Sequence, residues 1–229
     1  MTRFTDLVEG YRHFRTTEWQ DERERWSELA EGQSPKVMVI ACSDSRVEPA
    51  IIFDARPGEM FVVRNIAALA PPYETTPGHH GVSAALEFAV TQLEVEEVVV
   101  LGHGSCGGCA AALTGQFDRA EHGAGRFIAN WVKMLDEARD AVRAEHTHLD
   151  PKAFLEMELR AVQVSLANLR TFPWILEREA AGPGAARSCR IRPCIARDPD
   201  GQVSHEGGDR WVSGHVSAGR RHWVTNSTR

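Results

Sequence analysis

The sequence of 229 residues contains no apolar run near the roughly 18 residues that a membrane-spanning helix needs. It has no excess of basic residues either, because 26 Lys and Arg stand against 32 Asp and Glu, for a formal net charge of −6. The N-terminal residues MTRFTDLVEGYRHFR include no long apolar segment of the kind found in secretory signals. We therefore expect neither a membrane nor a nucleic acid as a partner.

Cysteine is scarce and odd in number, and the five cysteines are Cys42, Cys106, Cys109, Cys189 and Cys194. An odd count in a chain of this length does not suggest a framework of disulfides. A reduced, cytoplasmic protein is the simpler interpretation. In that compartment, clustered cysteines more often bind a metal or take part in catalysis.

Three short apolar runs predict buried strands at residues 36–41, 60–66 and 97–101. Nearly continuous apolar character, rather than alternation, is typical of parallel strands that are covered on both faces. A helix is predicted between the second and third strands, over 77–93, with Thr76 as its N-cap. This alternation indicates an α/β fold with a central, mostly parallel β-sheet flanked by helices.

Further helices are predicted before and after this region. Residues 1–31 form a helical arm, in which apolar residues recur at helical spacing among many Glu and Arg. Residues 126–145 and 151–181 form two more helices, and Asp150 followed by a proline is a typical start signal for the second.

The last part of the chain, residues 183–229, differs sharply in composition from the rest. It contains no Leu, Phe, Met, Tyr or Lys, and it holds eight Arg against four acidic residues. No segment in it shows clear strand or helix periodicity. We therefore expect an α/β domain over residues 1–182 and a tail that is poorly ordered and lies outside the packed core.

Two segments rich in reactive side chains, CSDSR at 42–46 and HGSCGGC at 103–109, each follow a predicted buried strand directly. Because reactive groups of open α/β sheets collect outside the carboxyl ends of strands, the two segments can meet in space. Together they offer two thiolates, one imidazole and one carboxylate. That set suits tetrahedral zinc, which takes sulfur and nitrogen ligands readily.

Three protein ligands and one exchangeable position are the arrangement of a catalytic zinc. Cys42, His103 and Cys106 are the firm candidates, and Asp44 is the weaker fourth. If Arg46 holds Asp44 away in a bidentate pair, a water can bind the metal and ionise nearer neutral pH than free water does. Asp44 would then orient the resulting hydroxide.

Other interpretations of the same residues stay open at this point. Cys42 could be a small buried hydrophobe, and Asp44 could cap a helix that begins near Val47. Cys106 and Cys109 form a C-x-x-C motif, which is also typical of thiol exchange. A redox motif alone, however, gives neither Asp44 nor His103 a role.

The runs ACSDSRVEP, PGEMFVVRNIAALAPPY and VVVLGHGSCGGCAAAL resemble signatures of the β-class carbonic anhydrases, in their plant-like branch. The resemblance covers residues 3–182. It implies one zinc per chain, held by Cys42, His103 and Cys106, with Asp44 and Arg46 as a catalytic dyad. Asp44 of this family can also close onto the metal. The implied reaction is the reversible hydration of carbon dioxide to bicarbonate and a proton by a zinc-bound hydroxide.

The resemblance also implies substrate contacts and an oligomer. Gln33 matches a glutamine that reaches the substrate across a dimer interface, and Gly107 matches a backbone position beside the substrate oxygen. Tyr73 and Phe88 match aromatic positions of a narrow apolar cleft, which suits a small uncharged substrate. A homodimer or higher homo-oligomer is therefore expected.

Some positions depart from the family pattern. A tryptophan that serves an inhibitory bicarbonate site in one branch is replaced by Val39, although Arg64 of that site is present. A histidine proposed as a proton shuttle is matched by Gln92, and the nearby His79 and His80 have no assigned role.

The tail departs most, because the family continues with a strand reading like ALHG…FDI. Read one base out of frame with freely chosen codons, residues 183–196 can give PALHGAAGFDLAS. A frameshift near residue 182 is therefore one hypothesis, which resequencing of the gene tests. Two functional alternatives follow: a zinc-binding member whose catalysis is impaired by the altered tail, and the same fold acting on another substrate such as CS₂.

Overall fold

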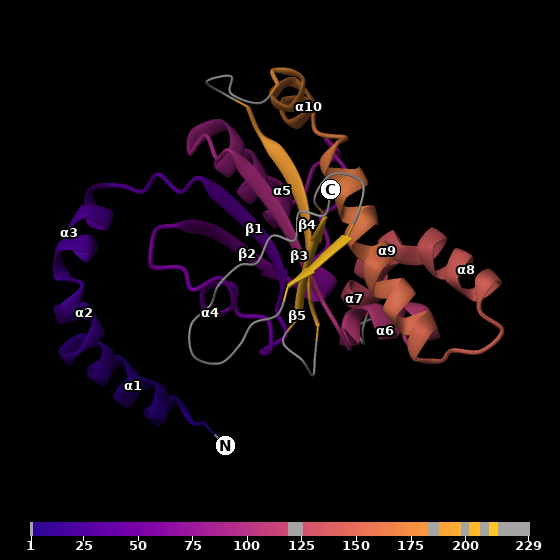
Figure 1. The fold of residues 1–229 in the computed structure, drawn as a ribbon, viewed down its shortest axis with the longest axis horizontal. Coiled ribbons are helices and arrows are strands. Elements are labelled where there is room, and N and C mark those ends of the chain that lie inside the picture. The colour runs from indigo at the N-terminus through magenta and orange to yellow at the C-terminus, as the bar shows by residue number, and fades with distance from the viewer. Residues whose placement is uncertain (1, 119–125, 183–187, 198–201, 207–210, 215–229) are drawn as a thin grey trace. The chain divides into compact units, whose positions relative to one another are not determined.

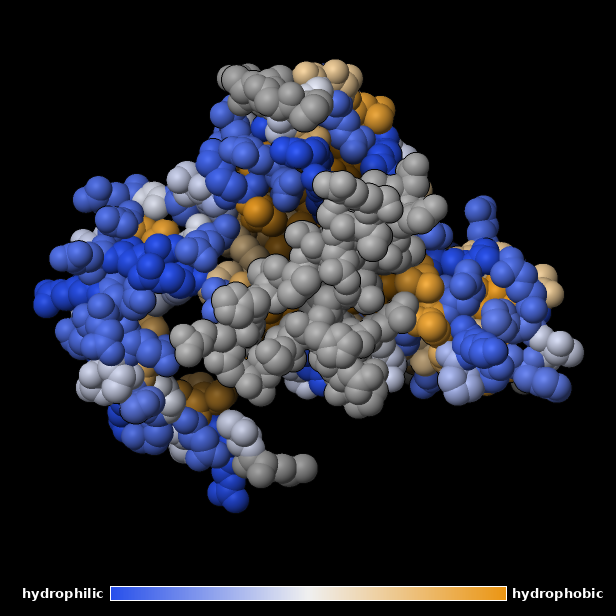
Figure 2. All heavy atoms as spheres, in the orientation of Figure 1, coloured by the Kyte–Doolittle hydropathy of each residue, from blue (hydrophilic) through white to orange (hydrophobic). Residues whose placement is uncertain are grey.

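The computed structural model describes residues 2–118, 126–182, 188–197, 202–206 and 211–214. The chain divides into two compact units, Met1–Ser34 and Pro35–Arg229. The first unit is the predicted helical arm and comprises α1 (Phe4–Thr16), α2 (Glu18–Asp21) and α3 (Arg23–Glu31). On the side seen in Figure 2 its surface is mainly hydrophilic, with hydrophobic residues interspersed. The arm is amphipathic, as the sequence predicts.

A six-stranded sheet forms the centre of the second unit, with strand order β2-β1-β3-β4-β5-β6 among the described residues (Figure 1). The first four strands in this order are parallel, and β5 and β6 add antiparallel pairs. The strands are β1 (Val37–Cys42), β2 (Met60–Asn65), β3 (Glu97–His103), β4 (Arg190–Arg197), β5 (Gln202–Glu206) and β6 (Trp211–Gly214). The three strands predicted from apolar runs are confirmed to within two residues at each end.

The strand order places a topological switch point at β1. The chain steps from β1 to β2 on one side and then to β3 on the other side of β1. Ligands of open α/β sheets bind in the crevice outside the carboxyl ends of strands at such a point. The crevice is bounded by Cys42, the last residue of β1, and His103, the last residue of β3.

Most helices of this unit cover one face of the sheet, where α6 to α9 lie together in Figure 1. Met38 and Ile40 of β1 and Val98 and Val100 of β3 point into this layer and are fully buried. The helices are α5 (Gly81–Glu87), η2 (Phe88–Gln92), α6 (Gly107–Thr114), α7 (Arg126–Val132), η3 (Lys133–Leu135), α8 (Asp136–Glu145), α9 (Pro151–Leu169) and α10 (Pro173–Ala180). Within the described residues no helix is long and apolar enough to span a bilayer.

The other face of the sheet carries a smaller apolar cluster. Val39, Ala41 and Leu101 are fully buried there, together with Val47 from the loop after β1. Ile52, at the end of α4 (Pro49–Ile52), packs against them. Because Val47 and Ile52 pack on this cluster, the loop between β1 and α4 is anchored to this face of the sheet.

The predicted helix boundaries need three corrections. The helix expected over 77–93 begins only at Gly81, with His80 rather than Thr76 at its N-cap, because the Thr76 carbonyl is engaged by the His80 ring at 2.9 Å. A 3₁₀ turn, η3, interrupts the helix expected over 126–145. The helix expected over 151–181 stops at Leu169, because the residue before a proline avoids the helical region and Pro173 starts a new helix.

Asp150 is confirmed as the start of α9. Its Oδ1 accepts hydrogen bonds from the main-chain N–H groups of Lys152 at 3.0 Å and Ala153 at 2.9 Å. These two bonds also hold the pKa of the Asp150 carboxyl below its usual value.

The expectation that the tail lies outside the packed core is wrong for residues 188–197. β4 pairs in parallel with β3 along seven residues, from Glu97↔Arg190 to His103↔Ala196. Ile191 and Ile195 point to the helical layer, and Cys194 points to the opposite cluster. The segment RIRPCIAR shows no clear strand pattern, because it combines a proline with three arginines and has only two isoleucines. Residues 183–187, 198–201, 207–210 and 215–229 of the tail lie outside the described residues.

Replacing Ile195 by alanine tests whether β4 belongs to the core. Ile195 is fully buried, so we expect the free energy of unfolding to fall by about 2–5 kcal/mol. Urea denaturation of the full chain measures this loss. A change within about 0.5 kcal/mol, as for an exposed site, would contradict the placement of β4.

Candidate metal centre

Three ligand side chains converge where β1 and β3 end. Cys42 closes β1, His103 closes β3, and Cys106 is the N-cap of α6. Their ligand atoms all lie within 4.8 Å of one another, and all three residues are buried. Ser105 adopts a left-handed φ of 55°, which turns the chain sharply between His103 and Cys106. The sequence therefore predicted correctly which three side chains meet.

The imidazole of His103 is oriented to offer one nitrogen to this cluster. Its Nδ1 lies 2.9 Å from the carbonyl oxygen of Gly104, and its Nε2 is buried without a hydrogen-bond partner in the described part of the chain. Burial alone lowers the pKa of His103, but the adjacent Cys42 sulfur and the Asp44 carboxylate outweigh it, so the net direction is upward. A buried, unpartnered ring nitrogen beside two sulfurs fits a metal ligand.

The two thiols resist ionisation in the protein alone. The pKa of Cys42 is raised to about 12 by its hydrogen bond with Cys106 and by burial. The pKa of Cys106 is raised to about 12, chiefly by its hydrogen bond with Cys109. Because a metal ligates the thiolate, a bound cation would supply the charge that this site needs to lose its protons. The residues present therefore fit a divalent ion that accepts sulfur and nitrogen.

The main-chain N–H of Cys106 donates to Glu158 Oε1 of α9 at 3.1 Å, so the ligand is anchored to the helical layer. Cys109 is buried against the core on α6, and all five cysteines are free thiols. This placement favours the interpretation of Cys109 as a packed residue.

Asp44 is held by Arg46 beside the cluster. Arg46 Nε donates to Oδ1 and Nη2 to Oδ2, both at 2.9 Å, and the Arg46 main-chain N–H adds a bond of 3.0 Å to Oδ1. These hydrogen bonds hold the pKa of Asp44 well below its usual range, so the carboxylate is ionised at neutral pH. Arg46 Nη2 also donates to the carbonyl of Ser105 at 3.0 Å, which ties the two site loops together.

A cavity of about 440 Å³ opens beside the cluster. Gly107, at the start of α6, lines it. Gly108 allows a close approach of the chain, since a Cβ there would lie 2.7 Å from Ile66 Cγ2. The lining residues are Cys42, Ser43, Asp44, Ile66, Gly107, Gly108, Ala111, Gln116, Phe117 and Ile128.

The other expected substrate residues lie elsewhere. The Tyr73 ring contacts Phe172 and Trp174 at centroid distances of 5.5 and 5.6 Å, so it does not line this cavity. Phe88 is 47 % exposed and contacts Phe61 at 6.0 Å. Gln33 belongs to the separate N-terminal unit.

The apolar lining residues Ile66, Phe117 and Ile128 were not predicted. They come from segments far apart in the sequence. For Ile66 the one available signal was its position at the end of a predicted strand.

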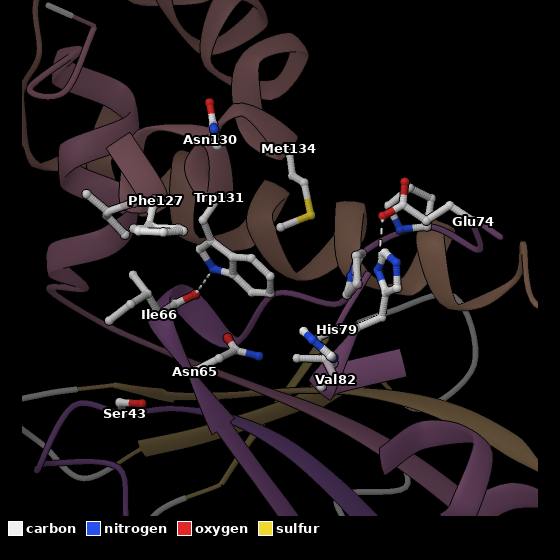
Figure 3. A pocket seen from close by; sticks show the side chains of 15 residues that line it. Ser43, Asn65, Ile66, Glu74, His79, Val82, Phe127, Asn130, Trp131 and Met134 are labelled. Atoms are coloured by element: carbon white, nitrogen blue, oxygen red, sulfur yellow. Dashed lines mark hydrogen bonds and ion pairs between the residues drawn. The ribbon is translucent and has the colours of Figure 1, made fainter. Parts of the chain in front are cut away.

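A larger cavity of about 880 Å³ adjoins the first and shares Ser43, Ile66 and Ile128 with it. Figure 3 shows Phe127, Trp131 and Met134 on one wall and His79 on another. Trp131 Nε1 donates to the Ile66 carbonyl at 2.9 Å, so the indole fixes the wall common to both cavities. Glu74 and His80 also line this cavity, with His80 Nδ1 lying 3.4 Å from Glu74 Oε1.

The fold and the site define an α/β protein with a buried Cys-His-Cys cluster, able to hold a metal ion, at the carboxyl edge of a parallel sheet. A family model described as carbonic anhydrase matches residues 37–186. The chain belongs to the β-carbonic anhydrase family.

Relatives and solved structures agree with this assignment. Beta carbonic anhydrase 3 of Arabidopsis thaliana is 38 % identical over 173 residues, covering 75 % of this chain and 66 % of the relative. The chloroplastic beta carbonic anhydrase 5 of the same plant is 38 % identical over 182 residues, with 78 % and 58 % covered. The chain thus spans less than two thirds of the length of these curated relatives.

Among solved structures, the β-carbonic anhydrase CcaA is similar with a TM-score of 0.81 and 28 % identity, and 92 % of each chain is covered. CafA of Aspergillus fumigatus is similar with a TM-score of 0.73 and 29 % identity, covering 90 % of this chain and 91 % of that one. The fold class predicted from the sequence is confirmed.

Proposed function

We propose that this chain catalyses the reversible hydration of carbon dioxide to bicarbonate and a proton, with one zinc ion held by Cys42, His103 and Cys106. The observation that carries the proposal is the Asp44–Arg46 pair beside the buried cluster. The Asp44 carboxylate lies next to the metal site, but both of its oxygens accept hydrogen bonds from Arg46. With Asp44 paired in this way, a metal held by the three residues would keep one position for water.

Zinc bound here would supply a Lewis acid that activates water near neutral pH. Cys42 and Cys106 would hold it as thiolates and neutralise its two charges. His103 would contribute Nε2, while the Gly104 carbonyl holds the other ring nitrogen in place.

Asp44 and Gly107 would position the reactants. Asp44 is ionised, so its carboxylate accepts a hydrogen bond from the attacking water and orients the oxygen toward the substrate. The main-chain N–H of Gly107 lies in the first turn of α6, where such groups lack an acceptor within the helix. It can donate to the oxygen on which negative charge develops. The apolar wall at Ile66 suits uncharged carbon dioxide.

The proposal includes a homodimer or higher homo-oligomer in the cytoplasm. β2 is an edge strand of the described sheet, and its Val62 is 38 % exposed. Phe88, whose ring contacts Phe61 of β2, is also exposed. An apolar edge of this kind favours pairing with a second copy. Gln33 and Phe88 would then contribute to a site across that interface.

Stopped-flow measurement with a pH indicator tests the reaction on zinc-loaded full-length protein. We expect carbon dioxide hydration well above the rate in buffer alone. We expect sulfide release from CS₂ at no more than the rate in buffer alone. Hydrolysis of CS₂ without hydration of carbon dioxide would overturn the substrate assignment. One zinc per chain with neither reaction would favour the catalytically impaired alternative.

A further inference from the structure

The guanidinium of Arg64 binds three successive points of the loop that carries the Asp44–Arg46 pair. Arg64 Nε donates to the carbonyl oxygen of Cys42 at 3.0 Å, and Nη2 donates to the carbonyl oxygen of Asp44 at 2.8 Å. Nη1 pairs with the carboxylate of Glu48, which is the N-cap of α4. One side chain thus fixes the beginning, the middle and the end of the loop 42–48.

Strand register explains why Arg64 can reach these points. In the parallel pair of β1 and β2, Arg64 lies opposite Ala41, one residue before Cys42. The next pair is reinforced past the strand end, because the main-chain N–H of Ser43 donates to the Asn65 carbonyl at 2.7 Å. The planar fork of an arginine has five N–H donors and can serve several acceptors at once, which a lysine ammonium cannot do in the same geometry.

Two arginines therefore hold Asp44 from opposite ends. Arg46 binds its carboxylate, and Arg64 binds its main-chain carbonyl. We propose that Arg64 is a positioning residue, which holds the loop so that the Asp44 carboxylate stays on Arg46 and away from the metal. The kinetic consequence rests on the proposed function, whereas the placement of Asp44 does not.

The contacts of Arg64 also separate this role from two others. Three of its five N–H donors bind two carbonyls and a carboxylate of the protein, and the Glu48 carboxylate already balances its charge, which argues against a site for a bound anion. If Arg64 served only to anchor α4, the Glu48 ion pair would carry its effect. The two carbonyl bonds to Cys42 and Asp44 would then be dispensable.

Four variants of the full chain distinguish these roles. Arg64→Gln removes all three contacts, Arg64→Lys keeps the charge but not the fork, and Glu48→Gln removes the ion pair alone. Arg160→Gln is the matched control. Arg160 is likewise a multiply bonded arginine, but it binds the carboxylates of Glu145 on α8 and Glu156 on α9. Zinc content, kcat and KM for carbon dioxide hydration, and the visible absorption spectrum of the cobalt-substituted protein are measured for each.

We expect Arg64→Gln to keep one metal per chain and to lower kcat by about 10- to 100-fold, as for a displaced catalytic group. Its cobalt spectrum should change, because Asp44 moves toward the metal. Arg64→Lys should fall between Arg64→Gln and the unaltered chain. For Glu48→Gln and Arg160→Gln, kcat should stay within about threefold of that of the unaltered chain, and the cobalt spectrum should be unchanged.

An unchanged cobalt spectrum in Arg64→Gln would overturn the proposal. So would loss of the metal, or an equal loss of kcat in Glu48→Gln. If Arg64→Gln does not fold, Arg64→Lys decides by the same criteria. If the unaltered zinc protein does not hydrate carbon dioxide, the proposed function fails, but the cobalt spectrum needs no turnover and still decides the role of Arg64.

Discussion

Replacing Cys106 by serine should weaken zinc binding by more than about 100-fold and abolish hydration of carbon dioxide. Loss of a group that merely orients a ligand already costs about 10- to 100-fold in metal affinity, so loss of a ligand should cost more. Competition with a chromogenic chelator measures the affinity, and elemental analysis gives the zinc content per chain.

Cys109→Ser is the matched control for this experiment. Cys109 lies on the same helix and is also buried, but it is not part of the three-residue cluster. We expect it to retain one zinc per chain. Zinc retained by Cys106→Ser would show that Cys106 is not a ligand. A Cys106–Cys109 disulfide under oxidant, in a protein that never binds zinc stoichiometrically, would support the thiol-redox interpretation instead.

Replacing Asp44 by asparagine should lower kcat by about 10²-fold, as for loss of a group that positions a reactant, while zinc stays bound. The amide keeps the shape of the carboxylate but not its charge. It therefore pairs poorly with Arg46 and accepts a weaker hydrogen bond from the attacking water. Ser45→Ala, at an exposed position in the same loop, should leave kcat near that of the unaltered chain.

The same substitution has a pH signature in stability. Arg46 depresses the pKa of Asp44 in the folded chain, so the pair stabilises the protein above the ordinary carboxyl pKa of about 3.9. That contribution to stability is lost as the pH falls from the ordinary carboxyl pKa toward the lower pKa of Asp44 in the folded chain. The difference in unfolding free energy between the unaltered chain and Asp44→Asn should therefore shrink below about pH 4.

The kinetic prediction for Asp44→Asn has its own contradicting outcome. If kcat falls by less than threefold while zinc stays bound, Asp44 is not a catalytic group.

The sequence predicted the core of the site because it depends on local patterns with a simple geometric consequence. Parallel buried strands are continuous apolar runs, so β1 and β3 were recognisable. Their carboxyl ends must share one edge of the sheet, so Cys42 and His103 had to lie close together. The spacing of the second segment then brought Cys106 to the same point.

Other parts depend on contacts between distant residues, which leave no local pattern. β4 was missed because RIRPCIAR at 190–197 holds a proline and three arginines, so it shows neither an apolar run nor strict alternation, and its burial depends on packing against β3 and α9. Tyr73 was expected in the cleft but packs on Phe172 and Trp174, which lie beyond the end of α9. The role of Arg64 follows only from strand register and three hydrogen-bond acceptors in another segment.

Zinc titration of the metal-free full chain tests the central claim most directly, with carbon dioxide hydration measured after each addition. The rate should rise in proportion to the zinc added and stop rising at one zinc per chain. Saturation with one zinc and no hydration above buffer would contradict the account. Hydration that does not depend on added zinc would contradict it equally.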